Sequence, residues 1–192
     1  MKLRVLLVDE DPERLAMLNA ALKTAGYEIA AEVRTSADLL EQVRAAEPDV
    51  IVIDRDSPDR DTLEHVCMVT RDAPRPVLLF TDDEDRATIR AAVQAGVSAY
   101  VVGELSPERI RPIIEVAMAR FEEHQALRRE LDQAKATLAE RKRIERAKGV
   151  VMKRRGVSEE EAYRLLRSMA MERGERLATV ADRVIAMADL LG

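Results

Sequence analysis

The chain has 192 residues, of which 35% are charged, with a net charge of −5 and one cysteine, Cys67. Residues 1–119 carry 14 basic and 23 acidic residues (14 − 23 = −9), whereas residues 120–192 carry 17 basic and 13 acidic ones (17 − 13 = +4). A single cysteine excludes an internal disulfide, and no apolar run approaches the roughly 20 residues of a membrane span. These features predict a two-part cytoplasmic protein with Cys67 in a core.

Five short apolar segments alternate with segments of helical periodicity in the acidic part: LRVLLV, EIAAEV, DVIVID, PVLLFT and SAYVV. Between them, Pro12–Ala25 and Asp85–Ala95 place apolar residues three and four apart, and Gly26 and Gly96 follow as helix ends. Strands this uniformly apolar are typical of a parallel sheet that helices cover on both faces. We therefore predict a doubly wound (βα)5 α/β domain of the flavodoxin type for residues 1–118.

A long helix is predicted from Glu108 onward, with Pro112 in its first turn and Gly149 as the next Gly or Pro. Its beginning, residues 119–126, links the two parts. Apolar residues spaced four, three and four apart form a short seam: Leu127, Leu131, Ala134 and Leu138. This spacing predicts a coiled-coil homodimer, and the alternative is that the seam packs against the last helices of the same chain.

Two further helices complete a small three-helix all-α domain, residues 127–188, which a tail at 189–192 follows. Ser158 with Glu161 forms a capping-box pattern that starts the first of them. The last helix, Ala178–Leu191, is amphipathic.

Carboxylates gather where the predicted strands end. Ligands of such sheets bind beyond the carboxyl ends of the strands, and the residues at those ends are Asp9, Glu10, Asp11, Asp54, Thr81 and Gly103. Crowded carboxylates favour a cation, and carboxylate oxygens together with water suit Mg²⁺. A carboxylate beside a bound cation can attack a phosphoryl donor, and Asp54 is the best placed for that reaction.

The motifs VLLVDED, VIVIDRDSP, LLFT and AYVV, in this order, resemble the receiver domain of bacterial response regulators over residues 1–118. The resemblance implies four magnesium ligands, the last through its backbone carbonyl: Asp9, Glu10, Asp54 and Asp56. It implies that Asp54 is the phosphoacceptor and that Thr81 forms a hydrogen bond with the phosphoryl group. Tyr100 would be the aromatic residue whose burial reports the signalling state.

This sequence departs from the receiver pattern at Gly103, which Glu104 follows. Receivers usually carry lysine there, followed by proline, and the missing ammonium would pair with Asp54 and the phosphoryl oxygens. Two interpretations remain open. The domain is either a working phosphorelay switch, served by a sensor protein or histidine kinase, or a vestigial receiver that protein contacts control.

Residues 141–155, RKRIERAKGVVMKRR, contain eight basic residues and one acidic residue, which indicates a polyanion-binding patch or a solvated helix face. Within Arg143–Ala181, the runs AKGVVM and EEAYRLLRSMAM resemble the ANTAR module, the three-helix RNA-binding domain of transcription antiterminators. A receiver followed by ANTAR is an arrangement of that family. Gly103 and the run PERIRP resemble its nitrate-assimilation branch.

Six residues are candidate RNA contacts: Lys148, Lys153, Arg154, Arg155, Arg167 and Tyr163. The lysines and the first two arginines cluster near a helix end at Gly156, where they can approach phosphates. Tyr163 and Arg167 share one helical face that can meet splayed bases. The alternative places Tyr163 in the core and Arg167 in a salt bridge to Glu160 or Glu161. Small residues such as Ala147 and Gly149 are predicted to let helices approach closely.

The sequence therefore predicts an antiterminator that binds RNA stem-loops in leader transcripts, with no membrane or DNA partner. A DNA-binding regulator is the alternative, although the acidic start of the helix after Ser158 would face phosphates unfavourably. An enzyme is not expected, because the basic domain has no His, Cys or Gly-rich phosphate loop.

Overall fold

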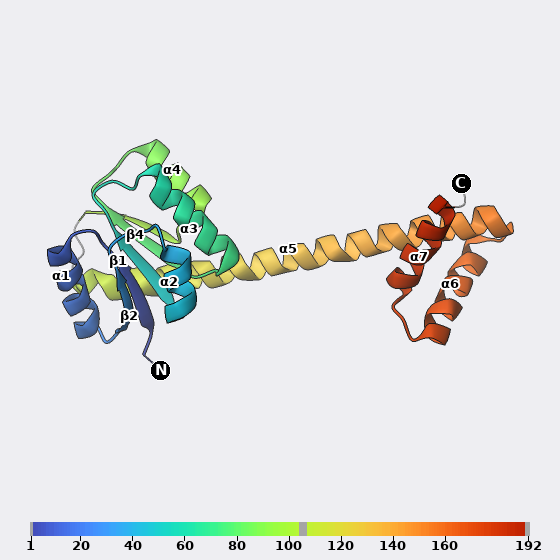
Figure 1. The fold of residues 1–192 in the computed structure, drawn as a ribbon, viewed down its shortest axis with the longest axis horizontal. Helices are drawn as coiled ribbons and strands as arrows, with labels where there is room; N and C mark the ends of the chain where they lie inside the picture. Colours follow the sequence, from blue (N-terminus) through green and yellow to red (C-terminus); the bar gives the residue numbers. More distant parts are fainter. Residues whose placement is uncertain (1, 104–106, 191–192) are drawn as a thin grey trace. The chain divides into compact units, whose positions relative to one another are not determined.

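In the computed structural model, which describes residues 2–103 and 107–190, the chain divides into two compact units, Met1–Gln125 and Ala126–Gly192. Strands and helices alternate through the first unit (Figure 1). Glu104 and Leu191, which enter the sequence-based expectations, lie outside the described residues.

The first unit contains five strands and the helices between them: β1 (Arg4–Val8), α1 (Pro12–Thr24), β2 (Glu28–Val33), α2 (Leu39–Ala46), β3 (Val50–Asp54), α3 (Arg60–Asp72), β4 (Val77–Thr81), α4 (Arg86–Ala95) and β5 (Ala99–Val102). The helix α5 (Pro107–Arg155) begins in the first unit and ends in the second, which also contains α6 (Glu159–Arg173) and α7 (Leu177–Leu190).

The sheet has the order β2-β1-β3-β4-β5, and every neighbouring pair is parallel. The order reverses between β1 and β3, the switch point where doubly wound folds bind ligands. Val8 pairs with Ile53 in the register of these two strands. Asp9 and Asp54, the residues that follow this pair, therefore meet at the switch point.

Apolar side chains fill both faces of the sheet. One core cluster joins Leu6, Ile51 and Leu79 of the strands to α2, α3 and α4, and the other joins Val5 and Phe80 to α1 and the start of α5. The inner strands β1, β3 and β4 are buried on both faces, which explains why they are so uniformly apolar, whereas the edge strands β2 and β5 are partly exposed. The predicted doubly wound fold is confirmed. Cys67, however, is exposed on α3, so its predicted core position is wrong.

The long helix is confirmed, although it starts earlier than the pattern suggested. Pro107 takes the first helical position, where a missing N–H costs nothing, and Pro112 lies inside the helix and not in its first turn. The helix continues through Gly149 and ends before Gly156, which adopts a positive φ of 64°. A Cβ at Gly149 would meet nothing within 4 Å, so its predicted role in close helix packing is wrong.

The second unit has its own small core, made by Ala147 of α5, Leu166 and Ala170 of α6, and Val180 and Ala181 of α7. The capping box that starts α6 is confirmed, because the Ser158 hydroxyl accepts from the Glu161 amide and the Glu161 carboxylate accepts from the Ser158 amide. None of the described helices combines the length and the hydropathy that crossing a membrane would need.

Candidate functional site

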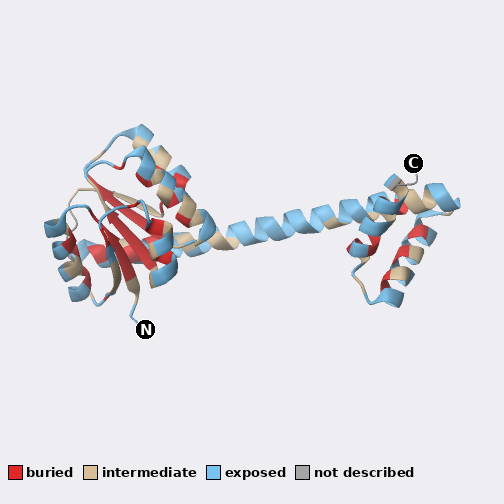
Figure 2. Cartoon of the chain, in the orientation of Figure 1, coloured by how far each residue is buried: buried red, intermediate tan, exposed pale blue. Residues whose placement is uncertain are grey.

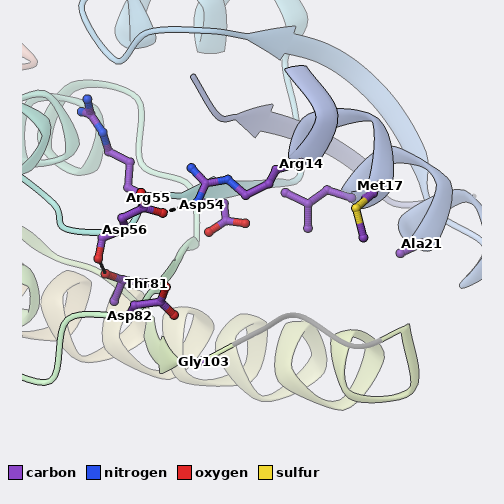
Figure 3. Close-up of a pocket in the computed structure, with 10 residues that line it drawn as sticks. Arg14, Met17, Ala21, Asp54, Arg55, Asp56, Thr81, Asp82 and Gly103 are labelled. Atoms are coloured by element: carbon purple, nitrogen blue, oxygen red, sulfur yellow. Dashed lines mark hydrogen bonds and ion pairs between the residues drawn. The ribbon is translucent and has the colours of Figure 1, made fainter. Parts of the chain in front are cut away.

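A cavity of about 420 Å³ opens at the carboxyl ends of β3, β4 and β5 beside α1 (Figure 3). Its lining consists of Arg14, Met17, Leu18, Ala21, Asp54, Arg55, Asp56, Thr81, Asp82 and Gly103. The structure thus brings Asp54, Thr81 and Gly103 together at one site. These three residues come from the ends of three different strands.

The Asp54 carboxyl group is hard to ionise in this pocket. Its pKa is raised from 3.8 to about 6, first because burial removes water from the carboxylate and then because Asp9, Asp56 and Asp82 add negative charge. Arg14 opposes these effects. A carboxylate in such surroundings is stabilised by any further cation that reaches it.

Asp9 has the position expected of a cation ligand. Its side chain is completely buried beside Asp54. The Asp9 Oδ1 atom accepts a hydrogen bond of 2.8 Å from the Asp11 amide, whereas Oδ2 is buried without a hydrogen-bond partner among the described residues. A buried, unpaired carboxylate oxygen is costly unless a cation or water meets it. Asp9 and Asp54 therefore fit a magnesium ion that takes its other ligands from water.

The full set of four expected magnesium ligands is not assembled. Across residues 2–103 and 107–190, no group of three or more His, Cys, Asp or Glu side chains could hold a metal ion. The Glu10 carboxylate pairs with Arg55 instead. The Asp56 carbonyl oxygen, expected at the metal, accepts hydrogen bonds from the Thr81 hydroxyl at 2.8 Å and from the Asp82 amide at 3.2 Å.

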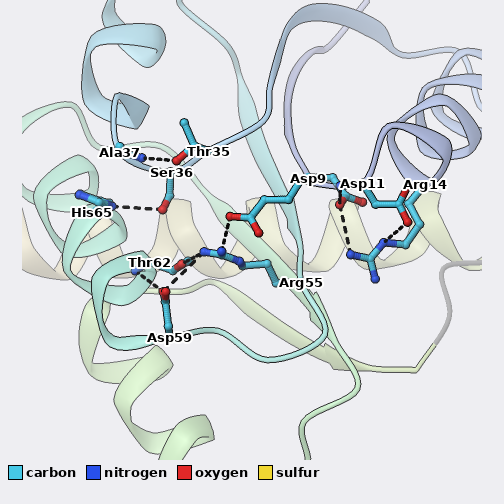
Figure 4. A network of polar contacts seen from close by, with 11 residues as sticks. Asp9, Asp11, Arg14, Thr35, Ser36, Ala37, Arg55, Asp59, Thr62 and His65 are labelled. Atoms are coloured by element: carbon cyan, nitrogen blue, oxygen red, sulfur yellow. Dashed lines mark hydrogen bonds and ion pairs between the residues drawn. The ribbon is translucent and has the colours of Figure 1, made fainter.

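Two arginines that the sequence analysis overlooked neutralise these acids (Figure 4). Arg14 pairs with Asp9 at 3.2 Å and with Asp56. Arg55, whose side chain is 19% exposed, contacts Glu10 and the Thr62 hydroxyl. Both could have been found in the sequence as basic residues close to an acidic motif. Arg14 lies in the first turn of α1 after the DED motif, and Arg55 directly follows Asp54.

The other residues expected from the receiver pattern lie in or directly after β4 and β5. Thr81 is 3% exposed, and its hydroxyl accepts a hydrogen bond from the Asp83 amide at 3.1 Å. The half-buried Tyr100 donates its hydroxyl hydrogen to the Asp83 carbonyl at 2.8 Å. Gly103 has a φ of 90°, a conformation that strains any side-chain-bearing residue. The backbone here favours glycine over the lysine of the receiver pattern.

The basic end of α5 divides into engaged and exposed side chains. Lys148 is 8% exposed, and its ammonium group lies 2.7 Å from Glu145 and 2.6 Å from Glu159. These carboxylates raise the pKa of Lys148, and the pair with Glu159 ties α5 to α6. Lys148 therefore stabilises the packing of α5 against α6, and its ammonium group is already paired and largely buried. The three basic residues beyond it are exposed: Lys153, Arg154 and Arg155.

The exposed face of α6 carries the predicted pair of Tyr163 and Arg167. Tyr163 is 41% exposed, so the interpretation that placed it in the core is wrong. Arg167 is exposed, and no ion pair joins it to Glu160 or Glu161 within the described part of the chain. Four residues separate the two side chains, which places them on one helical face. An aromatic ring and a guanidinium group are therefore both presented to solvent.

The predicted seam of α5 also lies in solvent. Every residue from 127 to 139 is exposed, as the pale blue middle of this helix shows (Figure 2). Leu127, Leu131 and Leu138 are 58%, 53% and 55% exposed. The alternative in which the seam packs against the last helices of the same chain is therefore wrong for these leucines.

Two family models match the chain. The response regulator receiver domain matches residues 5–115, and the ANTAR domain matches residues 132–185. The chain is 31% identical over 183 residues to the transcriptional regulatory protein PdtaR of Mycobacterium tuberculosis, a match that covers 95% of this chain and 89% of that protein.

Other relatives share less of the chain. The DNA-binding response regulator MtrA of Mycolicibacterium smegmatis is 27% identical over 127 residues, which cover 66% of this chain and 55% of that protein. A solved two-component response regulator of the LuxR family from Aurantimonas superposes with a TM-score of 0.56 and 26% identity, covering 62% of this chain and 86% of that one.

Proposed function

Because the chain belongs to the response regulators that join a receiver domain to an ANTAR domain, we propose that it is a transcription antiterminator that binds RNA stem-loops in leader transcripts. The observation that carries this proposal is the exposed Tyr163 and Arg167 pair in a unit whose long helix ends in Lys153, Arg154 and Arg155. Binding to a leader stem-loop would prevent a terminator hairpin from forming.

Each part of this surface suits a different part of RNA. Exposed lysines and arginines neutralise phosphates and provide affinity without sequence choice. Bases that a loop leaves unstacked can stack on an aromatic ring or a guanidinium plane, as Tyr163 and Arg167 offer. Arg154 donates a hydrogen bond of 3.1 Å to the Ala188 carbonyl, so a phosphate would compete with that contact. We place Lys148 among the residues that hold α6 in position.

The experiment compares leader RNA with duplex DNA of the same sequence in mobility-shift titrations at several salt concentrations. We expect the RNA to bind at least about tenfold more tightly, because its loops expose base faces that a duplex hides. Changing Lys153, Arg154 and Arg155 to glutamine should lower the slope of log affinity against log salt by about two.

Matched glutamine changes at Arg60, Arg71 and Arg86, exposed arginines of the first unit, should leave RNA affinity unaltered. Tighter binding to the duplex, or an equal loss from both triple variants, would refute the RNA-binding assignment. Tight duplex binding would favour the DNA-binding alternative.

We also propose that the receiver pocket controls RNA binding, with Asp54 as phosphoacceptor, Thr81 as its hydrogen-bonding partner and a sensor kinase as phosphoryl source. Receiver domains generally bind Mg²⁺ at the phosphorylation site. Asp9 and Asp54 would hold the ion here, and it would supply positive charge to the crowded carboxylates. Glu10 and the Asp56 carbonyl would have to leave their present partners to join them.

Phosphorylation is tested by incubating the chain with a small phosphodonor and Mg²⁺ and measuring its intact mass and RNA affinity. The unaltered chain should gain one phosphoryl group, and Asp54→Ala should gain none, whereas Asp61→Ala on α3 should behave as the unaltered chain. A phosphate-free chain with unchanged RNA affinity would exclude this route and leave control by a protein partner.

The exposed seam of α5 supports a further proposal, that two copies of the chain form a coiled-coil homodimer. An unpaired apolar stripe on a solvated helix is stabilised when a second copy covers it. Functional boundaries at residues 118 and 127 would then separate the receiver from the dimerising RNA-binding part. Assignment to the nitrate-assimilation branch stays a prediction from the sequence.

A further inference from the structure

The guanidinium group of Arg14 lies among the acids of the receiver pocket. One of its nitrogens lies 3.2 Å from Asp9 Oδ1, and another pairs with Asp56. The Asp9 side chain is completely buried, whereas that of Arg14 is 35% exposed. Arg14 therefore reaches from α1 to the buried Asp9 carboxylate and supplies a positive charge there (Figure 4).

This charge is permanent, because an arginine side chain does not lose its proton in a protein. Asp9 Oδ1 already accepts hydrogen bonds from Arg14 and the Asp11 amide. A divalent cation bound by Asp9 and Asp54 would bring a second positive charge close to the guanidinium group. Two cations that share one carboxylate group repel each other strongly in a partly buried site. Binding of the ion consequently favours release of Arg14.

Arg55 has a different effect on the same site. It holds the Glu10 carboxylate and contacts Asp59 at 3.5 Å and the Thr62 hydroxyl, both at the start of α3 (Figure 4). Arg55 thus withholds one potential ligand from the pocket, whereas Arg14 contacts the carboxylate that a cation would need. Arg14 is the residue whose position conflicts directly with a bound ion.

We infer that Arg14 is an internal counter-cation that competes with a divalent cation for Asp9, and that it thereby sets the metal affinity of the pocket. In the metal-free protein Arg14 neutralises Asp9 and Asp56. In the metal-bound protein it is displaced toward solvent. This inference rests on the proposed metal site, and it is independent of RNA binding.

A different role for Arg14 would follow if it replaced the lysine that is missing at Gly103 and paired only with a phosphoryl group on Asp54. Its removal would then leave affinity for Mg²⁺ unchanged in the unphosphorylated chain. The geometry favours competition, because the two terminal nitrogens of Arg14 contact Asp9 and Asp56 and not Asp54.

Calorimetric titration of the full chain with MgCl₂ tests the competition. We expect Arg14→Met to bind Mg²⁺ at least about fivefold more tightly than the unaltered chain, because the ion no longer displaces or faces a guanidinium group. Arg14→Lys, which keeps the charge, should lie between them. Lys23→Met, with the same loss of charge at the exposed far end of α1, should stay within about twofold of the unaltered chain.

Thermal unfolding followed by circular dichroism confirms that each variant is folded. A second measurement needs no variant: the side-chain Nε–Hε signal of Arg14 in NMR spectra should shift as Mg²⁺ saturates the unaltered chain. Equal or weaker Mg²⁺ affinity of Arg14→Met, or an unmoved Arg14 signal at saturation, overturns the competition but not the metal site. If neither chain binds Mg²⁺, both proposals fail.

Discussion

A Leu131→Glu chain is expected to be monomeric and to bind a leader RNA with two stem-loops about a hundredfold more weakly than the unaltered chain. Leu131 lies in the middle of the seam and is 53% exposed in the single chain, so the change removes no intramolecular core contact. In a dimer, however, two glutamates would face each other across an apolar seam. Loss of the dimer would remove the second RNA-binding unit and with it the gain from bivalent binding.

Sedimentation velocity measures the association, and titration with one or two stem-loops measures its consequence. Affinity for a single stem-loop should remain unchanged, because Leu131 lies outside the α6 surface. Ala136→Glu is the control, since it adds the same charge to the same exposed stretch of α5 at a position outside the seam. A dimeric Leu131→Glu chain would contradict the seam, and equal losses for one and two stem-loops would contradict bivalent binding.

The arrangement of strands and helices could be predicted because it depends on periodic patterns within the sequence. Residues 50–53 of β3, for example, are apolar at every position because both faces of the sheet are covered, and this marks them as a strand of a doubly wound fold. The capping box at Ser158 is a local signal and was read correctly for the same reason. The predicted start of α5 at Glu108 lies one residue from the observed start at Pro107, but Pro112 was wrongly placed in the first turn, because a proline is locally compatible with that position.

The site could be predicted only in part. The topology of the strands is enough to bring Asp9 and Asp54 together. Their positions at the carboxyl ends of two apolar segments were visible in the sequence. The ion-pair partners of the adjacent acids, Glu10 and Asp56, are arginines with long, flexible side chains. Sequence patterns do not predict in which direction such side chains point. Arg55 reaches Glu10 across 45 residues in this way. The sequence left open whether Tyr163 faces solvent or lies in the core, and the fold decides it, because apolar residues of three helices already fill that core.

The pocket and the fold are also linked through stability, because Asp54 is ionised at a cost. In metal-free buffer at pH 7, Asp54→Asn is expected to stabilise the first unit by about 1 to 2 kcal/mol. A pKa of about 6 against an ordinary 3.8 corresponds to about 3 kcal/mol in full. Solvent screening of this half-buried carboxylate reduces that figure.

The sign of this effect depends on pH. The folded chain holds the Asp54 proton more tightly than the unfolded chain, so stability falls as pH rises from about 3.8 to about 6 and stays lower above that range. The advantage of Asp54→Asn should therefore vanish below pH 4. Hydrogen exchange of the strand amides measures the free energy of unfolding of this unit.

Asp83→Asn provides the contrast for this prediction. The Asp85 amide and the Ser57 hydroxyl, which donate hydrogen bonds to Asp83, hold the pKa of that carboxyl below its ordinary value. Its ionised form is therefore favoured by folding, and removing the charge should not stabilise the unit at pH 7. If Asp54→Asn gave no gain at pH 7, or the same gain at pH 4, crowding and burial of Asp54 would not be the cause. A gain confined to neutral pH would mean that the ionised Asp54 destabilises the fold. A cation that neutralises this charge, or a phosphoryl bond that removes it from the carboxylate, would then relieve the same cost.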